Sequence, residues 1–212
     1  MIRKYLYVSL VLVFGCRNND YSGPLNSFKR YPFKNVHLSY TFTGDARGRE
    51  DLYIADYGKY ETRDTKIELL LTNGIRPKEE SGITRLTDVY TIDHLQKKVM
   101  HRHVRVLDSL YHLDASSVPS SEDYLQTSMR DFLFINGGID TIGGFPATRW
   151  EPRDGSMKLW VWNALLLKKY TISQNGIVWM DLVQMDTNWV ADSSKFRIPS
   201  DGYEVVEDTK PQ

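Results

Sequence analysis

The sequence predicts a mainly β protein of the α+β class, built as one large curved antiparallel sheet with a helix that covers one face. Alternating apolar and polar residues, which are typical of half-buried strands, recur in short hairpin steps and amount to about ten strands. A single stretch has helical spacing and a capping signal. Aromatic residues make up 12% of the chain, with 13 Tyr and 5 Trp, and this composition favours β-structure.

The first half of the domain shows strand patterns separated by turn signals. We expect strands over residues 36–43, 50–57, a short stretch that ends near 61, 66–72, 86–93 and 97–104. Residues 76–82 are rich in charge and are expected to form a loop. The apolar residues of 105–113 fit a strand and one face of a helix equally, so both interpretations stay open.

One helix is predicted after residue 119. Ser120 can cap its first turn, and Asp123, three residues later, completes a start that resembles a capping box. Asn136-Gly137 is expected to end it. Such a helix is marginal alone and must lay its apolar face on a sheet. The apolar residues at i, i+4 and i+7 are Leu125, Met129 and Phe132.

The last third of the chain consists of strand patterns joined by turns. Pro152-Arg153-Asp154-Gly155 and Gln174-Asn175-Gly176 are hairpin turn signals. The strands expected here cover residues 145–150, 157–163, 165–173, 177–185, 196–199 and 203–206. The glycine pairs at 137–138 and 143–144 are expected to serve bulges or turns, since they lack the context of a phosphate-binding loop.

The N-terminus has the layout of an export signal. Arg3 and Lys4 precede an apolar stretch over residues 5–14, and Gly15 stands before Cys16, the only cysteine. The apolar stretch is too short for a membrane span, which needs about 20 residues. These residues resemble the lipobox of bacterial lipoproteins, which implies a lipid on Cys16 and removal of the signal. An ordinary signal peptide that happens to end in a cysteine is the alternative.

This layout divides the chain into a signal peptide (1–15), a lipidated tether (16–34) and a single domain (35–212). The expected partner of the tether is a membrane, through the lipid on Cys16. With Cys16 lipidated, the chain has no cysteine left for a disulfide. Arg17 and Asn18 follow Cys16 in place of a retaining aspartate, which implies a periplasm-facing outer-membrane lipoprotein of the bacterial cell envelope. We expect a monomer.

Charge excludes one class of partner. The chain has 27 basic and 27 acidic residues, and removal of residues 1–15 takes away only Arg3 and Lys4, which leaves a net charge of −2. Nucleic-acid binding needs clustered positive charge, so no nucleic acid is expected.

The late part of the domain resembles the LolA/LolB-like superfamily of bacterial lipoprotein carriers. The resemblance rests on Ile142-Gly143-Gly144, Leu159-Trp160-Val161-Trp162, Leu165-Leu166-Leu167-Lys168, Phe196-Arg197-Ile198-Pro199 and the earlier turn Asp56-Tyr57-Gly58-Lys59. It implies an unclosed barrel, a helical lid and an apolar cavity that binds acyl chains. The predicted anchor and the lack of an N-terminal helix depart from LolA and favour a membrane-attached acceptor or a fixed scaffold.

The function predicted from the sequence is therefore binding of a lipid or acyl chain between sheet and helix. The alternative is a structural or protein-interaction lipoprotein with a filled core and no ligand. For the candidate lining residues, plain core is the favoured interpretation. The candidate ligand-binding residues are Leu125, Met129, Phe132, Trp160, Trp162, Leu165, Leu167 and Met180.

Catalytic and metal chemistry are not expected. His101 and His103 share one strand face and His94 precedes them across a turn, but basic residues surround the pair and would repel a cation. No nucleophile elbow of the form G-x-S-x-G is present. We therefore predict no cofactor, no metal and no enzyme.

Overall fold

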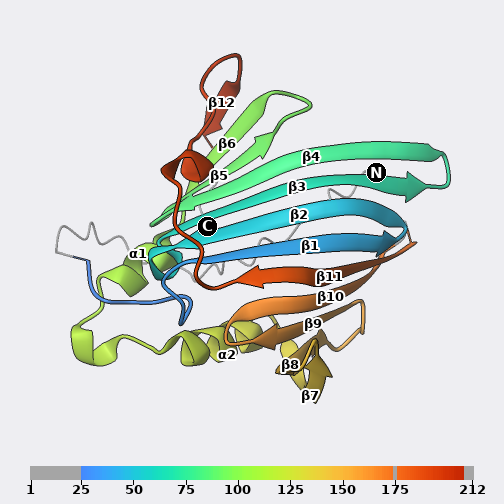
Figure 1. The fold of residues 1–212 in the computed structure, drawn as a ribbon. Helices are drawn as coiled ribbons and strands as arrows, with labels where there is room; N and C mark the ends of the chain where they lie inside the picture. The colour runs from blue at the N-terminus through green and yellow to red at the C-terminus, as the bar shows by residue number, and fades with distance from the viewer. Residues whose placement is uncertain (1–24, 174–175, 208–212) are drawn as a thin grey trace.

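The computed structural model describes residues 25–173 and 176–207. Within them, twelve strands form one sheet in the order β12-β6-β5-β4-β3-β2-β1-β11-β10-β9-β8-β7 (Figure 1). Neighbouring strands are antiparallel, except that β12 runs parallel to β6. The outermost strands β12 and β7 do not pair with each other. The predicted class, a mainly β protein with a large curved sheet that is not closed, is confirmed.

The elements follow the chain in two sets. The first contains β1 (Val36–Gly44), β2 (Ala46–Ala55), η1 (Asp56–Gly58), β3 (Tyr60–Leu71), β4 (Gly74–Arg85), β5 (Asp88–Asp93) and β6 (Lys98–His103). Then come the helical segments α1 (Arg105–Tyr111), η2 (Ala115–Ser117) and α2 (Ser121–Asp131). The second set contains β7 (Phe134–Ile142), β8 (Phe145–Pro152), β9 (Met157–Trp162), β10 (Leu165–Ser173), β11 (Gly176–Asp186), η3 (Ser193–Phe196) and β12 (Glu204–Glu207).

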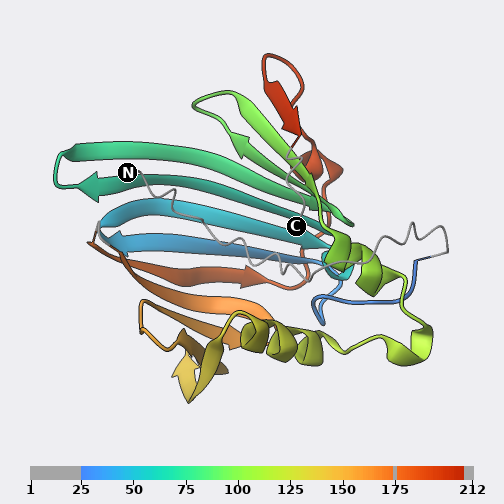
Figure 2. The same cartoon turned by 180° about the vertical axis from the view of Figure 1, so that it is seen from behind.

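The two faces of the sheet carry different cover. The helices α1 and α2 lie over one face, which we call the inner face and which is turned to the viewer in Figure 2. The segment between β11 and β12 crosses the other, outer face (Figure 1). There Phe196 packs beside Tyr53 of β2, and Tyr203 packs beside Ile83 and its neighbours on β4 to β6.

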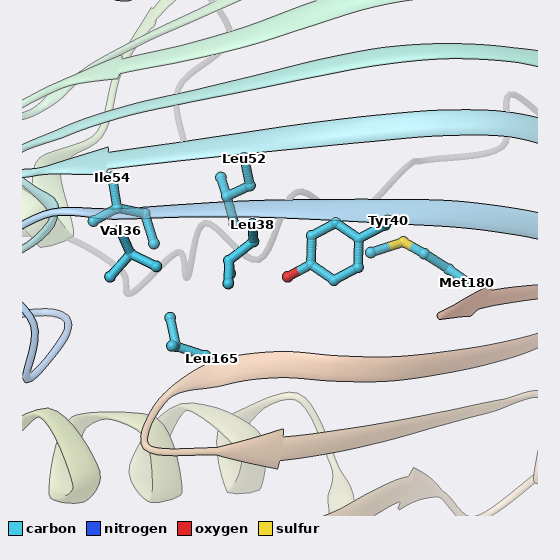
Figure 3. Close-up of a cluster of buried hydrophobic side chains, with 7 residues drawn as sticks. All are labelled: Val36, Leu38, Tyr40, Leu52, Ile54, Leu165 and Met180. Atoms are coloured by element: carbon cyan, nitrogen blue, oxygen red, sulfur yellow. The ribbon is translucent and has the colours of Figure 1, made fainter. Parts of the chain in front are cut away.

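A row of apolar side chains fills the inner face at the middle of the sheet. Val36, Leu38 and Tyr40 alternate along β1, and residues of β2, β10 and β11 meet them (Figure 3). The Tyr40 hydroxyl donates to the carbonyl of Leu166 at 2.8 Å, so this ring reaches from β1 to β10. The buried members of this cluster are Val36, Leu38, Tyr40, Leu52, Ile54, Leu165 and Met180.

The predicted helix exists but ends earlier than expected. Ser120 accepts a hydrogen bond from the backbone N–H of Asp123, as the capping signal predicts. The helix stops at Asp131, with Phe132 as its C-cap and Leu133 at φ 61°. Asn136-Gly137 was expected to be the stop, and it belongs instead to β7, where a bulge follows Asn136. The Asn-Gly stretch therefore marks a bulge and not a helix end, and Gly138 adopts a positive φ of 100° in that bulge.

The other corrections concern strand boundaries. The two strands expected around 61 and over 66–72 are one continuous strand, β3, and the loop expected over 76–82 is part of β4. The high charge of residues 76–82 does not indicate a loop, because charged residues pair across these strands, as between Lys66 and Glu79. Residues 196–199 are not a strand, because they follow η3 across the outer face. Residues 105–113, left open, form α1.

Part of the predicted tether packs onto the domain. Phe28 is buried among residues of α1 and β5, and its ring meets Tyr111 and Tyr124 edge-on. Asn26 donates its amide to the carbonyls of Leu110 and Leu113. Residues 25–34 are thus held against α1 and the inner face. Cys16 and the predicted signal lie outside the described residues.

Candidate functional site

The inner face has a continuous apolar region beneath two covers, α2 and the N-terminal segment. Around Met129, α2 packs on Trp150, Leu159 and Val161 of β8 and β9. The cluster centred on β1 is instead covered by Tyr31 and Phe33 of the N-terminal segment. Leu166 contacts both clusters. The apolar surface therefore runs without interruption from β1 to β8 under two covers, which meet where Phe28 packs on Tyr124 of α2.

The structure distributes the predicted lining residues over four clusters. Leu125 and Met129 lie under α2, and Leu165 and Met180 lie in the cluster of Figure 3. Phe132 packs instead with α1 and Phe28. These five residues all belong to the side of the sheet that the helices cover.

The remaining predicted residues do not join them. Trp160 alternates with Leu159 and Val161 and therefore faces the outer side, where it donates to Asp140 at 2.7 Å. Leu167 belongs to the same outer cluster, next to a bulge in β10. Trp162 borders both this cluster and that of Figure 3. Consecutive apolar residues on β9 hide which side chain faces which way, so sequence alone could not separate them.

Beside the apolar region, the inner face carries a buried network of charges. Glu61 Oε2 lies 3.4 Å from Arg30 Nη2 and accepts the Tyr31 hydroxyl at 2.8 Å. Arg63 Nε lies 3.5 Å from Glu50 Oε1, and Glu50 Oε2 accepts the Thr65 hydroxyl at 2.8 Å. Arg30 also donates to the carbonyl of Gly58 at 2.8 Å. The network joins the N-terminal segment to β2 and β3.

Burial and charge shift the pKa values in this network. Burial lowers the pKa of Arg30, but the carboxylate of Glu61 outweighs it, so the pKa lies above its ordinary value. The same balance, with Glu50 as the main partner, raises the pKa of Arg63. Burial raises the pKa of Tyr124 to about 12. Both arginines therefore stay charged inside the fold.

Lys169 of β10 differs from these paired groups. It lies between Met180 of β11 and Leu159 of β9 in the strand register, within the apolar region, and is half-buried. Within the described part of the chain it makes no hydrogen bond and no ion pair. Burial lowers the pKa of Lys169, and the charge of Arg63 acts in the same direction.

The charges that act on Lys169 also show how strongly the sheet curves. In the sheet order, β2 with Glu50, β3 with Arg63 and β4 with Lys78 lie three, four and five strands away from β10. The charges of these three side chains nevertheless shift the pKa of Lys169. A flat sheet would separate Lys169 from Lys78 by about 24 Å at its usual strand spacing. The inner face is therefore concave, and these side chains project into a shared interior.

Sequence reasoning missed this charged part of the inner face. Glu50, Glu61 and Arg63 alternate with outward residues on β2 and β3, so their pattern resembles an ordinary solvated strand face. A usable signal was present only in Leu167-Lys168-Lys169-Tyr170, where two adjacent lysines must face opposite sides of a strand. One of them had to lie on the inner face.

The outer face holds two polar clusters that contain Ser, His and Asp. Ser39 donates to Asp51 at 2.6 Å, and His37 Nε2 lies 3.2 Å from the same carboxylate oxygen. A hydrolase needs its serine hydrogen-bonded to a histidine that the carboxylate orients through the other ring nitrogen. Here the Ser39 hydroxyl donates its hydrogen bond to the carboxylate of Asp51 and lies 3.4 Å from His37 Nε2, the same ring nitrogen that faces Asp51, so the order of a triad is not formed.

The second cluster ties down the C-terminal segment. Ser81 donates to Asp64 at 2.6 Å and lies 2.7 Å from His94 Nε2, while His94 Nδ1 lies 2.8 Å from the Tyr203 hydroxyl. The buried serine hydroxyl again donates its hydrogen bond to a carboxylate. Both clusters are thus hydrogen-bonded supports of the outer face.

The three histidines considered for a metal do not gather. His94 is held by Ser81 and Tyr203, whereas His101 and His103 both approach Asp88. Within residues 25–173 and 176–207, no three His, Cys, Asp or Glu side chains are placed to hold a metal ion. Over the same residues, no helix has the length and apolar character of a membrane span.

Comparison with known proteins yields structural likeness only. No family model and no curated protein matches the chain. An uncharacterized conserved protein from Thermus thermophilus aligns with TM-score 0.45 at 10% identity over 82% of this chain and 91% of its own. LprF from Mycobacterium bovis aligns with TM-score 0.32 at 12% identity over 76% and 89%. A putative outer membrane lipoprotein-sorting protein domain from Vibrio parahaemolyticus aligns with TM-score 0.28 at 8% identity over 79% and 91%. These scores are too low to carry a functional argument.

Proposed function

We propose that this protein is a membrane-anchored envelope lipoprotein that binds an acyl chain of a lipid or lipoprotein on the inner face of its sheet. The observation that carries the proposal is the continuous apolar region under α2 and the segment around Tyr31 and Phe33. Lifting α2 from the sheet breaks apolar contacts and no strand pairing, whereas the N-terminal segment is also held by Glu61 and by backbone hydrogen bonds to Tyr57. An acyl chain that entered between α2 and the sheet would replace the apolar contacts.

Heavy-atom quenching tests where a chain binds. Bromine on 9,10-dibromostearate quenches tryptophans that it touches. Trp150 lies on the inner face under α2, whereas Trp189 packs on the outer face beside Tyr53. The mature chain without its lipidated cysteine, residues 17–212, retains every described residue and serves as the sample. Quenching that weakens in Trp150→Phe and is unchanged in Trp189→Phe supports the proposal, and no quenching of the wild type contradicts it.

The anchor is a separate part of the proposal. Cys16 with a lipid would hold the domain at a membrane, with the outer membrane and a periplasm-facing orientation as the expected place. Mass spectrometry of the detergent-extracted protein tests it, since a lipidated Cys16 adds a covalent mass. The Cys16→Ala variant should lack that mass and leave the membrane fraction. An unmodified Cys16 in the wild type would contradict the proposed lipid anchor.

A structural or interaction role is the second candidate, and the edge strand β7 favours it. Leu133, Ile135 and Ile139 are exposed along this edge, with 77%, 48% and 73% of their surface accessible. An unpaired edge with apolar side chains is a template for strand addition. Under this candidate the core is filled, and Ile139→Lys would disturb association of the protein while leaving the inner face unchanged.

A further inference from the structure

Two hydrogen-bond donors without partners lie in one row of the inner face. Met180, Lys169, Leu159 and Trp150 face each other successively across β11, β10, β9 and β8. Trp150 is only 5% exposed, and its buried indole Nε1 has no hydrogen-bond partner among the described residues. Lys169 has no partner either within the described chain. Since one strand separates them, their backbones lie about 10 Å apart.

A buried donor without a partner is costly, and so is a half-buried charge in apolar surroundings, so the two point to an acceptor that the described residues do not supply. The surrounding carboxylates lie against other cations, and although the charge of Glu50 attracts Lys169, the two form no hydrogen bond or ion pair within the described residues. Arg30 and Arg63 hold Glu61 and Glu50, and Lys78 Nζ lies 2.5 Å from Glu80. After these pairs are formed, Lys169 contributes one uncompensated positive charge to the interior. The matching group is an oxygen acceptor with a single negative charge.

The neighbours of this row define the rest of the ligand. Leu159 stands between the two donors and packs, with Trp150, against Met129 of α2. Met180 on the other side belongs to the apolar cluster of Figure 3. A ligand that satisfies Lys169 must therefore lay an apolar body on this surface, and a small inorganic anion would leave it bare.

We propose that the ligand is a monoanionic acyl lipid whose charged headgroup is bound by Lys169, with Trp150 donating to a second oxygen and the acyl chain under α2. This inference rests on the proposed function and specifies its ligand class. Neutral and cationic amphiphiles are disfavoured, because they leave Lys169 without a counter-charge in apolar surroundings.

The test compares two probes of equal chain length, hexadecanoate and hexadecanol, by isothermal titration of residues 17–212 near neutral pH. Lys169→Met removes the charge and keeps an unbranched side chain, while Lys169→Arg keeps the charge. The matched control is Lys168→Met, because Lys168 faces the outer side, where it pairs with Asp181 at 2.9 Å. Charge-assisted hydrogen bonds predict a loss of at least about tenfold for hexadecanoate in Lys169→Met. Hexadecanol affinity should not fall in Lys169→Met and should rise, because the charge that a neutral ligand leaves uncompensated is gone, and Lys169→Arg and Lys168→Met should bind both probes like the wild type.

The outcomes separate this inference from the proposed function. If hexadecanoate and hexadecanol bind equally well and Lys169→Met changes neither, the acyl site stands and the anionic specificity is wrong. If neither probe binds to the wild type, the proposed function itself fails. A further check is stability: an ion pair between Lys169 and Glu50 in solution would make Lys169→Met less stable than the wild type, and that result would also overturn the inference.

Discussion

Replacement of Glu61 by Gln tests the buried charge network. Glu61 lies 3.4 Å from Arg30 and 3.9 Å from Arg63, and it accepts the Tyr31 hydroxyl. Arg63 keeps Glu50, but Arg30 keeps only the carbonyl of Gly58 and is left as an uncompensated charge in a site where its side chain is 9% exposed. Breaking a buried pair in this way costs about 3–5 kcal/mol. We expect Glu61→Gln to lose about 3 kcal/mol of unfolding free energy.

The same strand supplies the matched control. Glu68 of β3 pairs with Arg47 at 2.7 Å, but the two side chains are 46% and 62% exposed. Glu68→Gln should therefore cost less than about 1 kcal/mol, and salt should abolish even this cost. Urea unfolding followed by tryptophan fluorescence measures both variants. Equal and small losses in the two variants would refute the argument that the network is buried and paired.

The remaining predictions concern the lid and the C-terminal strand. Met129→Ala should cost about 2–5 kcal/mol, because Met129 is buried and its truncation leaves a cavity between α2 and the sheet; urea unfolding checks this. Ser120→Ala should cost about 1 kcal/mol through loss of the helix cap, seen as a lower midpoint in the same assay. Burial lowers the pKa of His101, but hydrogen bonds to Asp88 and Glu207 outweigh it and raise the pKa above its ordinary value of 6.5. The contribution of His101 to the unfolding free energy is therefore complete below that value and disappears as pH rises through the raised pKa. The loss of unfolding free energy in His101→Gln should shrink between pH 5 and 8. A loss that stays constant over this range would contradict the prediction.

Sequence periodicity predicted the sheet well where one face is apolar and the other polar. The strand over 36–43 and the hairpins of the last third follow from this alternation, and β1 and β8 to β11 lie close to their predicted positions. The helix cap at Ser120 was readable because its signal is local. These features depend on neighbours in the chain, which the sequence contains directly.

The failures have a common physical cause. Charged residues of β3 and β4 pair across strands, and Glu61 and Arg63 pair inside the concave face, so their polarity does not mark a loop. Which residues meet depends on the curvature of the whole sheet. For the same reason, the inner position of Lys169 and the outer position of Trp160 could not be predicted from the sequence. The candidate binding residues could be proposed from sequence only as a set, and the structure divides that set between two faces.

Native mass spectrometry of residues 17–212 decides whether an acyl lipid binds between sheet and helix. We expect a non-covalent mass of lipid size on the protein as purified, or stoichiometric uptake of added hexadecanoate, and we expect Lys169→Met to reduce this binding. A clean mass without uptake of hexadecanoate or phospholipid would mean that the apolar region between sheet and helix is a filled core. The structural role would then replace lipid binding.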